Sequence, residues 1–165
     1  MFENDFISEF QHGFVRGRSC TTQLLQVMDK WTEILDQGGT VDSIYLDFAK
    51  AFDSVPHKRL LLKLEGYGVV GRVLGWIKDF LMGRRQRVMI AGEASRWAEV
   101  VSGVPQGSVL RPVLFVCYIN DMPETISSMI YMYADDTKIA GRVDNEEEVK
   151  ILQSDLDKLV DWSQT

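Results

Sequence analysis

Hydrophobic residues recur at three- and four-residue steps in several stretches of the chain, the spacing that places them on one face of an α-helix. The first such stretch follows Ser19 and Thr21, two N-cap candidates, and stops at the glycines 38–39. We expect the methionines and tryptophans on these stripes, and valines such as Val73 and Val149, to be buried. The expected helices cover 21–37, 56–66, about 70–82, about 108–119 and 145–164.

Apolar and polar side chains alternate elsewhere, which predicts β-strands. In 41–48 the alternation places Asp47 on the polar face, away from the core-facing side chains. Residues 85–101 are expected to form a hairpin with Gly92 in its turn, and 129–141 two short strands joined at Ala134-Asp135-Asp136. This order of elements predicts an α+β fold, with helices on one face of a mainly antiparallel sheet.

Composition excludes several classes of protein. The chain has 165 residues, of which 45% are hydrophobic and 25% charged, as expected for one globular domain. The two cysteines, Cys20 and Cys117, are not spaced as a pair, which excludes a disulfide scaffold and a cysteine zinc site. There is no apolar run of membrane-spanning length and no secretory signal pattern. We therefore expect an intracellular protein without a membrane partner, in the nucleus or the cytoplasm.

The charge is unevenly distributed along the chain. The net charge is −6, yet residues 56–92 carry eight basic side chains and two acidic ones. A local basic surface can follow a phosphate backbone even on an acidic protein. A solvated helix face would show the same composition, so charge alone leaves both interpretations open.

Three aspartates are candidates for chemistry, namely Asp47 on a strand and Asp135 and Asp136 in a turn. Carboxylates on adjacent strands repel each other unless something neutralises them, and a divalent cation with oxygen ligands is the usual solution. The alternative is structural, because aspartate favours turns whether or not it binds a metal. These residues by themselves leave the two interpretations open.

Six segments, in this order, resemble the reverse transcriptases of non-LTR (LINE-type) retrotransposons, from about Gln11 to Gln164. The resemblance implies a polymerase palm with part of the fingers, forming a single domain over 1–165. The lower fingers would cover about 11–40, and the palm 41–165 with inserted fingers helices and a hairpin at about 56–101. A thumb and an endonuclease are expected to be absent. The segments are QHGFVRGRSCTTQLL, YLDFAKAFDSVPHKRLL, GRRQRV, SGVPQGSVL, LFVCYINDMP and YADDTKI.

The resemblance also implies a catalytic set. Asp47 matches the first catalytic aspartate of the family, and Asp135 with Asp136 matches the pair in its Y-x-D-D turn. In such polymerases Asp47 and Asp135 would be direct ligands of two Mg²⁺ ions, for which Mn²⁺ can substitute, and Asp136 would tune the site.

Further positions would bind the substrates. Phe52 matches the steric gate that excludes a ribonucleotide 2′-hydroxyl, although core packing would equally explain a phenylalanine there. Gln106 and Gly107 match the loop beneath the incoming nucleotide. Gly13 lies in a glycine-rich basic loop along which the template would run. The expected template and primer contacts are Arg16, Arg18, Arg85 and Tyr133.

The resemblance implies an RNA-directed DNA polymerase that adds deoxynucleotides to a primer 3′-hydroxyl. Its partners would be an RNA template, a DNA primer and deoxynucleoside triphosphates. Arg111 departs from the family, which usually has glycine there, and its side chain could crowd the template or the nucleotide pocket. The alternative is a catalytically inactive module, derived from a retroelement, that binds RNA or protein. A nuclease built on the same aspartates is a weaker third hypothesis.

Overall fold

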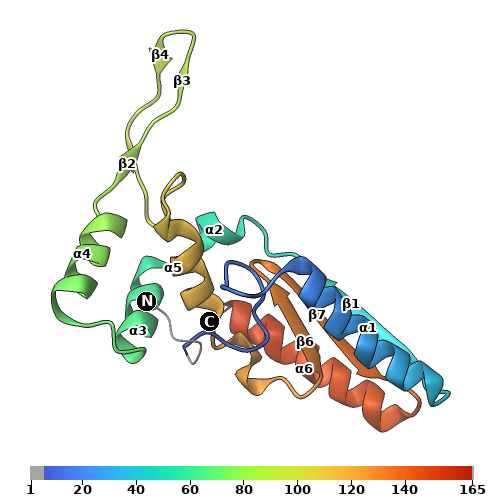
Figure 1. Cartoon of the computed structure of the whole chain (residues 1–165). Coiled ribbons are helices and arrows are strands. Elements are labelled where there is room, and N and C mark those ends of the chain that lie inside the picture. Colours follow the sequence, from blue (N-terminus) through green and yellow to red (C-terminus); the bar gives the residue numbers. More distant parts are fainter. Residues whose placement is uncertain (1–5, 165) are drawn as a thin grey trace. The chain divides into compact units, whose positions relative to one another are not determined.

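The computed structural model describes residues 6–164 (Figure 1). The chain folds as two compact units. Unit 1 is formed by Met1–Phe48 together with Ile119–Thr165, and unit 2 by Ala49–Tyr118. Unit 2 is thus inserted, in chain order, between the two parts of unit 1. Its bounds enclose the inserted helices and hairpin that the sequence predicts at about 56–101.

Unit 1 contains a three-stranded antiparallel sheet. The strands are β1 (Val41–Leu46), β6 (Met129–Tyr133) and β7 (Asp136–Arg142), in the order β1-β7-β6. Ile139 of the central strand pairs with Ile44 on one side and Ile130 on the other, so the apolar positions form a continuous row. The strands predicted in 41–48 and 129–141, and the antiparallel α+β architecture, are confirmed.

Helices cover both faces of this sheet, whereas the sequence analysis predicts one (Figure 1). A Cβ on Gly141 would lie 3.5 Å from Leu152 in α6 (Glu146–Gln164). On the opposite face, the Lys138 ammonium lies 5.5 Å from the Trp31 ring centre of α1 (Cys20–Asp36). The reason is that β6 is apolar or aromatic at every position, MIYMY, so both of its faces need cover. The short helix η1 (Met122–Thr125) precedes β6.

Asp155 of α6 is a fully buried carboxylate that joins the helix to the loop before β6. Its oxygens accept hydrogen bonds from the backbone N–H groups of Ser127 (2.9 Å) and Ser128 (2.7 Å) and from Lys158 Nζ (2.7 Å). Burial alone would raise the pKa of Asp155, but the hydrogen bonds from Lys158, Ser128 and Ser127 outweigh it and hold this pKa below its ordinary value.

We expect Asp155 to make folding sensitive to acid. A carboxyl whose pKa is lower in the folded state stabilises the fold above its unfolded pKa, and this contribution is lost as the pH falls through the folded value. The unfolding free energy should therefore decrease below about pH 4. Asp155→Asn should flatten that decrease and cost about 1–3 kcal/mol at pH 7, measured by urea unfolding. Asp157→Asn, on the exposed side of the same helix, is the matched control, and equal pH profiles for the two variants would contradict the assignment.

Unit 2 is built from helices and a hairpin. The helices are α2 (Ala51–Ser54), α3 (His57–Gly66), α4 (Gly71–Leu81) and α5 (Leu110–Ile119), the last residue of which belongs to unit 1. The hairpin pairs β2 (Arg85–Gln86) with β5 (Ala98–Glu99), and further out β3 (Met89–Ile90) with β4 (Glu93–Ala94). Gly92 occupies its turn with a φ of 91°, as predicted.

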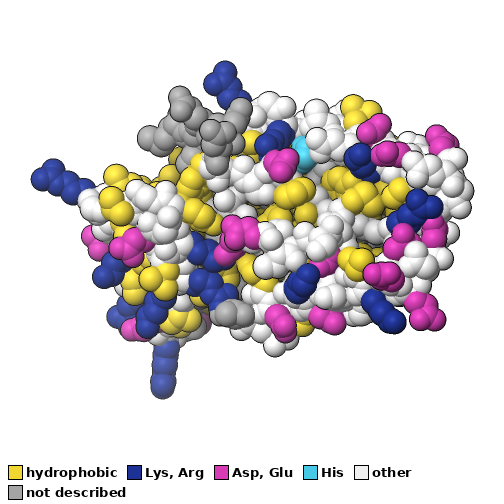
Figure 2. All heavy atoms as spheres, turned by 90° about the horizontal axis from the view of Figure 1, so that it is seen from below, with side chains coloured by type: hydrophobic (Ala, Val, Ile, Leu, Met, Phe, Trp, Pro, Cys, Tyr) yellow, Lys and Arg dark blue, Asp and Glu magenta, His cyan; other side chains and the backbone are white. Residues whose placement is uncertain are grey.

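The apolar stripes are only partly buried, which corrects the sequence expectation. Ile77, Leu81, Leu152 and Leu159 are buried as predicted. The exceptions that are more than half exposed include Met28, Val73, Trp76 and Trp97, and Val149 is nearly so. A three-stranded sheet offers each helix a narrow surface, so α1 buries Gln23 and Val27 instead of its leucine stripe. Figure 2 shows hydrophobic side chains open to solvent between charged ones on one face.

Within residues 6–164, no helix has both the length and the apolar character needed to cross a membrane.

Candidate active site

Strand register brings the three candidate aspartates to one end of the sheet in unit 1. Leu46, the last residue of β1, pairs with Thr137, so the next position along each strand is Asp47 and Asp136. Asp136 pairs in turn with Tyr133 of β6, and Asp135 lies in the two-residue turn between them. Asp47 and Asp136 are exposed and Asp135 is half-buried. Backbone register therefore places residues distant in sequence at the same end of the sheet.

The turn that carries Asp135 is held by a buried glutamine. Ala134 adopts a left-handed backbone with φ 56°, which is unusual for a residue with a Cβ. The Gln11 Oε1 accepts hydrogen bonds from the Ala134 N–H (2.8 Å) and the Gly13 N–H (2.7 Å), and its Nε2 donates to the Ala134 carbonyl at 3.4 Å. Gln11 is 1% exposed, so these bonds are not shared with water. The side chain of Gln11 thus stabilises a strained turn.

Gly13 is buried and lies against the same turn. A Cβ at Gly13 would lie 2.2 Å from the backbone nitrogen of Ala134, which no side chain tolerates. The segment is fixed alongside β6 by backbone hydrogen bonds from His12 N to Met132 O (2.8 Å) and from Met132 N to Phe10 O (3.0 Å). Sequence reasoning missed Gln11, because a buried glutamine has no periodicity that would distinguish it.

The carboxylates at this edge are hard oxygen donors, the kind that Mg²⁺ and Mn²⁺ prefer. Asp47 comes from one strand and Asp135 from the turn beside the neighbouring strand, so their donor type and their placement at one end of the sheet fit a divalent cation. Within residues 6–164, however, no three His, Cys, Asp or Glu side chains are gathered closely enough to enclose a metal ion. Asp47 and Asp135 therefore fit a divalent cation by the type of their donor atoms and by the register of their strands.

In unit 2, Phe52 of α2 is a half-buried ring with two neighbours. It stacks on Phe115 of α5, with ring centres 4.2 Å apart and planes inclined by 29°. The guanidinium carbon of Arg111 lies 5.0 Å from the centre of the Phe52 ring, and Arg111 Nη2 donates to Asp53 Oδ1 at 3.0 Å. The ring is thus restrained by contacts with both α5 residues.

The loop before α5 is joined by hydrogen bonds to the α2 region. Val104 N donates to Phe52 O, and Gly103 N donates to Val55 O, both at 2.9 Å. Gly103 has a φ of 83°, and a Cβ there would lie 2.7 Å from the Asp53 carbonyl oxygen, so the approach requires glycine. The next residues include Gln106 and Gly107, both exposed. Phe52 and the predicted nucleotide loop are therefore parts of one hydrogen-bonded framework.

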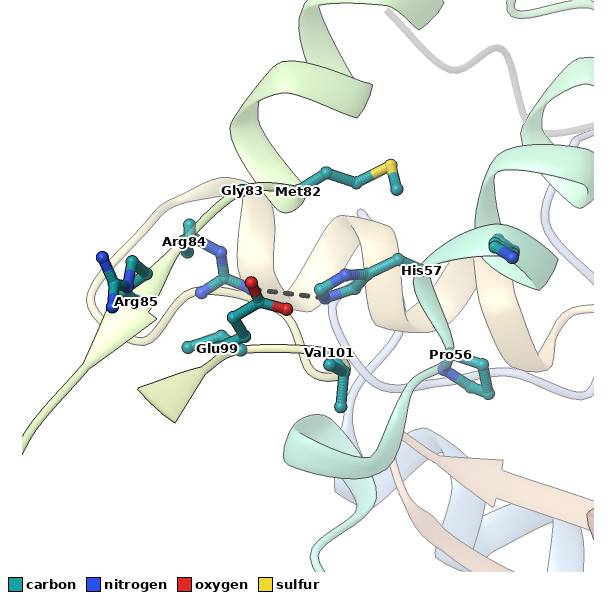
Figure 3. A pocket seen from close by; sticks show the side chains of 10 residues that line it. Pro56, His57, Met82, Gly83, Arg84, Arg85, Glu99 and Val101 are labelled. Carbon is teal, nitrogen blue, oxygen red and sulfur yellow. Dashed lines mark hydrogen bonds between the residues drawn. The ribbon is translucent and has the colours of Figure 1, made fainter. Parts of the chain in front are cut away.

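The Gly103 carbonyl oxygen is contacted by His57 of α3 and by Arg84 of the loop before β2. Both of these residues line a hollow of about 420 Å³ (Figure 3). His57 Nε2 lies 2.9 Å from this oxygen, and Arg84 Nη2 donates to it at 2.7 Å. A carbonyl only accepts, so the contact places a proton on Nε2, and the 3.3 Å approach of Arg84 to His57 is a packing contact. Burial lowers the pKa of Arg84, and Arg85 and Glu99 also line the hollow.

The residues expected to contact the template or primer differ in how exposed their side chains are and in whether they bond within the chain. Arg16 is exposed, and Tyr133 beside the aspartate turn is 37% exposed. Arg18 is turned inward, where its Nη1 donates to the carbonyls of Ser8 (2.8 Å), Glu9 (3.0 Å) and Gln11 (2.6 Å). Arg18 therefore shapes the loop that contains Gln11 and Gly13.

Arg85 lies on the exposed hairpin of unit 2, next to an exposed aromatic ring. The Trp97 ring is 52% exposed, with the guanidinium carbons of Arg85 and Arg87 at 5.9 and 4.7 Å from its centre. Arginines beside an exposed indole form the kind of surface that binds phosphates and stacks on bases.

Comparison with known proteins identifies a family that spans the chain and relatives that match most of it. A family model described as "Reverse transcriptase (RNA-dependent DNA polymerase)" matches residues 1–165. The chain is 35% identical over 139 residues to a "Probable RNA-directed DNA polymerase from transposon X-element" of Drosophila melanogaster, covering 81% of this chain and 15% of that protein. It is 32% identical over 166 residues to an "RNA-directed DNA polymerase from mobile element jockey" of Drosophila funebris, covering 95% and 18%.

A solved structure shares the fold. It is described as "Structure of apo telomerase from Candida Tropicalis truncated from C-terminal domain", with a TM-score of 0.66, 11% sequence identity, and coverage of 90% of this chain and 32% of that chain. The likeness shows a shared mixed helix and antiparallel sheet architecture, in agreement with the expected palm and fingers fold.

Proposed function

The chain belongs to the reverse transcriptase family, and from this premise we propose that it carries the catalytic centre of an RNA-directed DNA polymerase of the non-LTR retrotransposon type. The observation that carries the proposal is the strand register that places Asp47 and the Asp135-Asp136 turn at one end of one sheet. The chain spans 15% and 18% of the two relatives named above. Activity of the isolated chain is therefore part of the proposal.

In the proposed reaction, the 3′-oxygen of a DNA primer attacks the α-phosphorus of a deoxynucleoside triphosphate. A P–O bond forms to the primer, the bond to the β-phosphate breaks, and pyrophosphate leaves. Asp47 and Asp135 are the residues that would hold two divalent ions, Mg²⁺ or Mn²⁺. Such ions, when bound, lower the pKa of the 3′-hydroxyl and neutralise the leaving pyrophosphate. Asp136 adds negative charge next to these ligands, and Gln11 keeps the turn in place.

Substrate selection would come from unit 2. Phe52 would pack against the sugar and leave no room for a 2′-hydroxyl. Gly107 is exposed with no other heavy atom within 4 Å of where its Cβ would be, so it would let the nucleotide approach the backbone closely, with Gln106 offering its amide to the nucleotide or its paired base. Arg16, Tyr133 and Arg85 would contact the RNA template or the primer, with Arg18 acting through the loop that it holds. Such a chain would work inside the cell, where these substrates occur.

The test is primer extension on an RNA template with the purified chain, in Mg²⁺ or Mn²⁺. We expect deoxynucleotides to be added in either metal and none after chelation by EDTA, because carboxylates alone do not activate a 3′-hydroxyl. A matched DNA template shows whether RNA is preferred. Absence of extension in both metals, from a chain that binds template–primer, would contradict the proposal.

That contradictory result would support a second candidate function, an RNA-binding module without catalysis. The exposed hairpin with Arg85, Arg87 and Trp97 favours it, because this surface needs no metal to bind a strand. Binding through phosphate contacts should weaken steeply between about 50 and 200 mM salt, because such binding releases counterions that added salt restores. Affinity without such a salt dependence would indicate an apolar protein interface instead.

A further inference from the structure

Arg111 is a cation at an electrostatically unfavourable position. It is the second residue of α5 (Leu110–Ile119), at the positive end of the helix dipole. A lysine or arginine is favoured at the opposite end of a helix, so helix stability does not explain Arg111. An explanation must come from what its side chain contacts.

Those contacts converge on Phe52 and its neighbour in sequence. The guanidinium carbon lies 5.0 Å from the centre of the Phe52 ring, and Nη2 donates to Asp53 Oδ1 at 3.0 Å. The Arg111 side chain is only 21% exposed. Phe115, one turn further along α5, stacks on the Phe52 ring at 4.2 Å. Phe52 is therefore restrained from α5 by an aromatic ring and a cation.

The backbone on which Phe52 sits is fixed as well. Its carbonyl accepts the Val104 N–H at 2.9 Å, and the Ser102 hydroxyl donates to the Asp53 carbonyl at 2.9 Å. Rotation of the Phe52 side chain is the movement that remains, and Arg111 opposes it from a position anchored by Asp53. Without a side chain at 111, the ring would lose the cation contact and keep its stacking on Phe115.

We propose that Arg111 is a specificity-determining residue that braces Phe52 and thereby strengthens selection of deoxynucleotides over ribonucleotides. The inference rests on the proposed function, in which Phe52 excludes the 2′-hydroxyl. If the Phe52 ring can tilt, it leaves room for the 2′-hydroxyl of a ribonucleotide. If Arg111 holds the ring in place, it does not. Arg111 acts through Phe52 and is a positioning residue.

The experiment measures single-nucleotide addition by the whole chain, with kcat/KM for a deoxynucleotide divided by kcat/KM for the matching ribonucleotide. Arg111→Gly should lower this ratio about tenfold, through faster use of the ribonucleotide. The free energy of a contact between a cation and an aromatic ring corresponds to a change in rate of about that size. Arg111→Lys keeps the charge without the flat guanidinium, and its ratio should lie between those of the wild type and Arg111→Gly. Arg72→Ala, an exposed arginine of α4, should keep the wild-type ratio.

A parallel measurement does not depend on turnover. Equilibrium affinities for the two nucleotides are compared on a primer that lacks a 3′-hydroxyl, and thermal unfolding checks that each variant is folded. The Arg111→Gly ratio should fall in this assay too. An equal loss for both nucleotides would overturn the proposal, because it would make Arg111 a phosphate contact or a purely structural residue.

Phe52→Val separates failure of the inference from failure of the proposed function. If Phe52→Val lowers the ratio and Arg111→Gly leaves it unchanged, the positioning role of Arg111 is refuted, and Phe52 remains the residue that excludes the 2′-hydroxyl. If Phe52→Val leaves the ratio unchanged, Phe52 is not the gate, and the inference falls with that assignment. A wild-type chain that binds neither nucleotide refutes both.

Discussion

Asp135→Asn should abolish primer extension, with a loss of about 10³-fold or more. The substitution keeps the size of the side chain and removes the negative charge that would hold a divalent ion, an interaction that supplies several kcal/mol to the transition state. Asp47→Asn should have the same effect, because in the proposed function Asp47 holds the same ions from the end of the neighbouring strand. Single-turnover extension rates on an RNA template, in Mg²⁺, provide the measurement.

Two further variants make this result specific. Asp136→Asn should lose less activity, because Asp136 is expected to tune the site without binding the ion directly. Asp42→Asn removes an exposed carboxylate from the other end of β1 and should leave extension unchanged. If Asp42→Asn and Asp135→Asn gave equal rates, the assignment of Asp135 would be wrong.

Gly13→Ala should be the most damaging substitution outside the carboxylates themselves. The new methyl group would lie 2.2 Å from Ala134 N, so the turn that carries Asp135 must move. A displacement of about 1 Å at a reacting group can cost about 10²-fold in rate. Overpacking a buried contact should also lower the unfolding free energy by about 1–3 kcal/mol. Extension kinetics and urea unfolding, run in parallel, measure the two effects.

Comparison variants separate the clash from the hydrogen bonds. Gln11→Leu leaves the space at Gly13 free but removes the acceptor shared by the Gly13 and Ala134 N–H groups. It should reduce stability and extension together. Gly75→Ala in α4 adds the same methyl group where no heavy atom lies within 4 Å apart from the neighbouring residues and the backbone of the same helix, and it should stabilise the helix slightly. Full activity of Gly13→Ala would show that the turn does not depend on this contact.

Much of the fold follows from local patterns. The strand ends at Leu46 and Tyr133, the Ser19 cap, which accepts the Thr22 N–H, and the start of α6 after Asn145 are all close to the predicted positions. Each depends on neighbouring residues along the chain, such as a cap, a turn or an alternation. The short helix α2 was not predicted, because four residues are too few to show a helical period.

The details of the site depend on contacts that no local pattern contains. The sequence motifs predict Asp47 and Asp135 as metal ligands, and the strand register places both at one end of the sheet. Gln11 and Gly13 act on a turn more than a hundred residues away, as the hydrogen bonds to Ala134 show. Arg111 could only be noted as a departure, since its contacts with Phe52 and Asp53 arise when α5 packs beside α2. Roles of this kind become visible in tertiary structure alone.

The insertion of unit 2 between β1 and the β6–β7 hairpin has a consequence for how the protein folds. The hairpin closes over a two-residue turn, a local event on the microsecond scale. Pairing of β1 with β7 must instead close a loop of chain that contains all of unit 2, and such long-range closure is entropically expensive and slow. We therefore expect the hairpin that carries Asp135 and Asp136 to form before β1 brings Asp47 to the same end of the sheet.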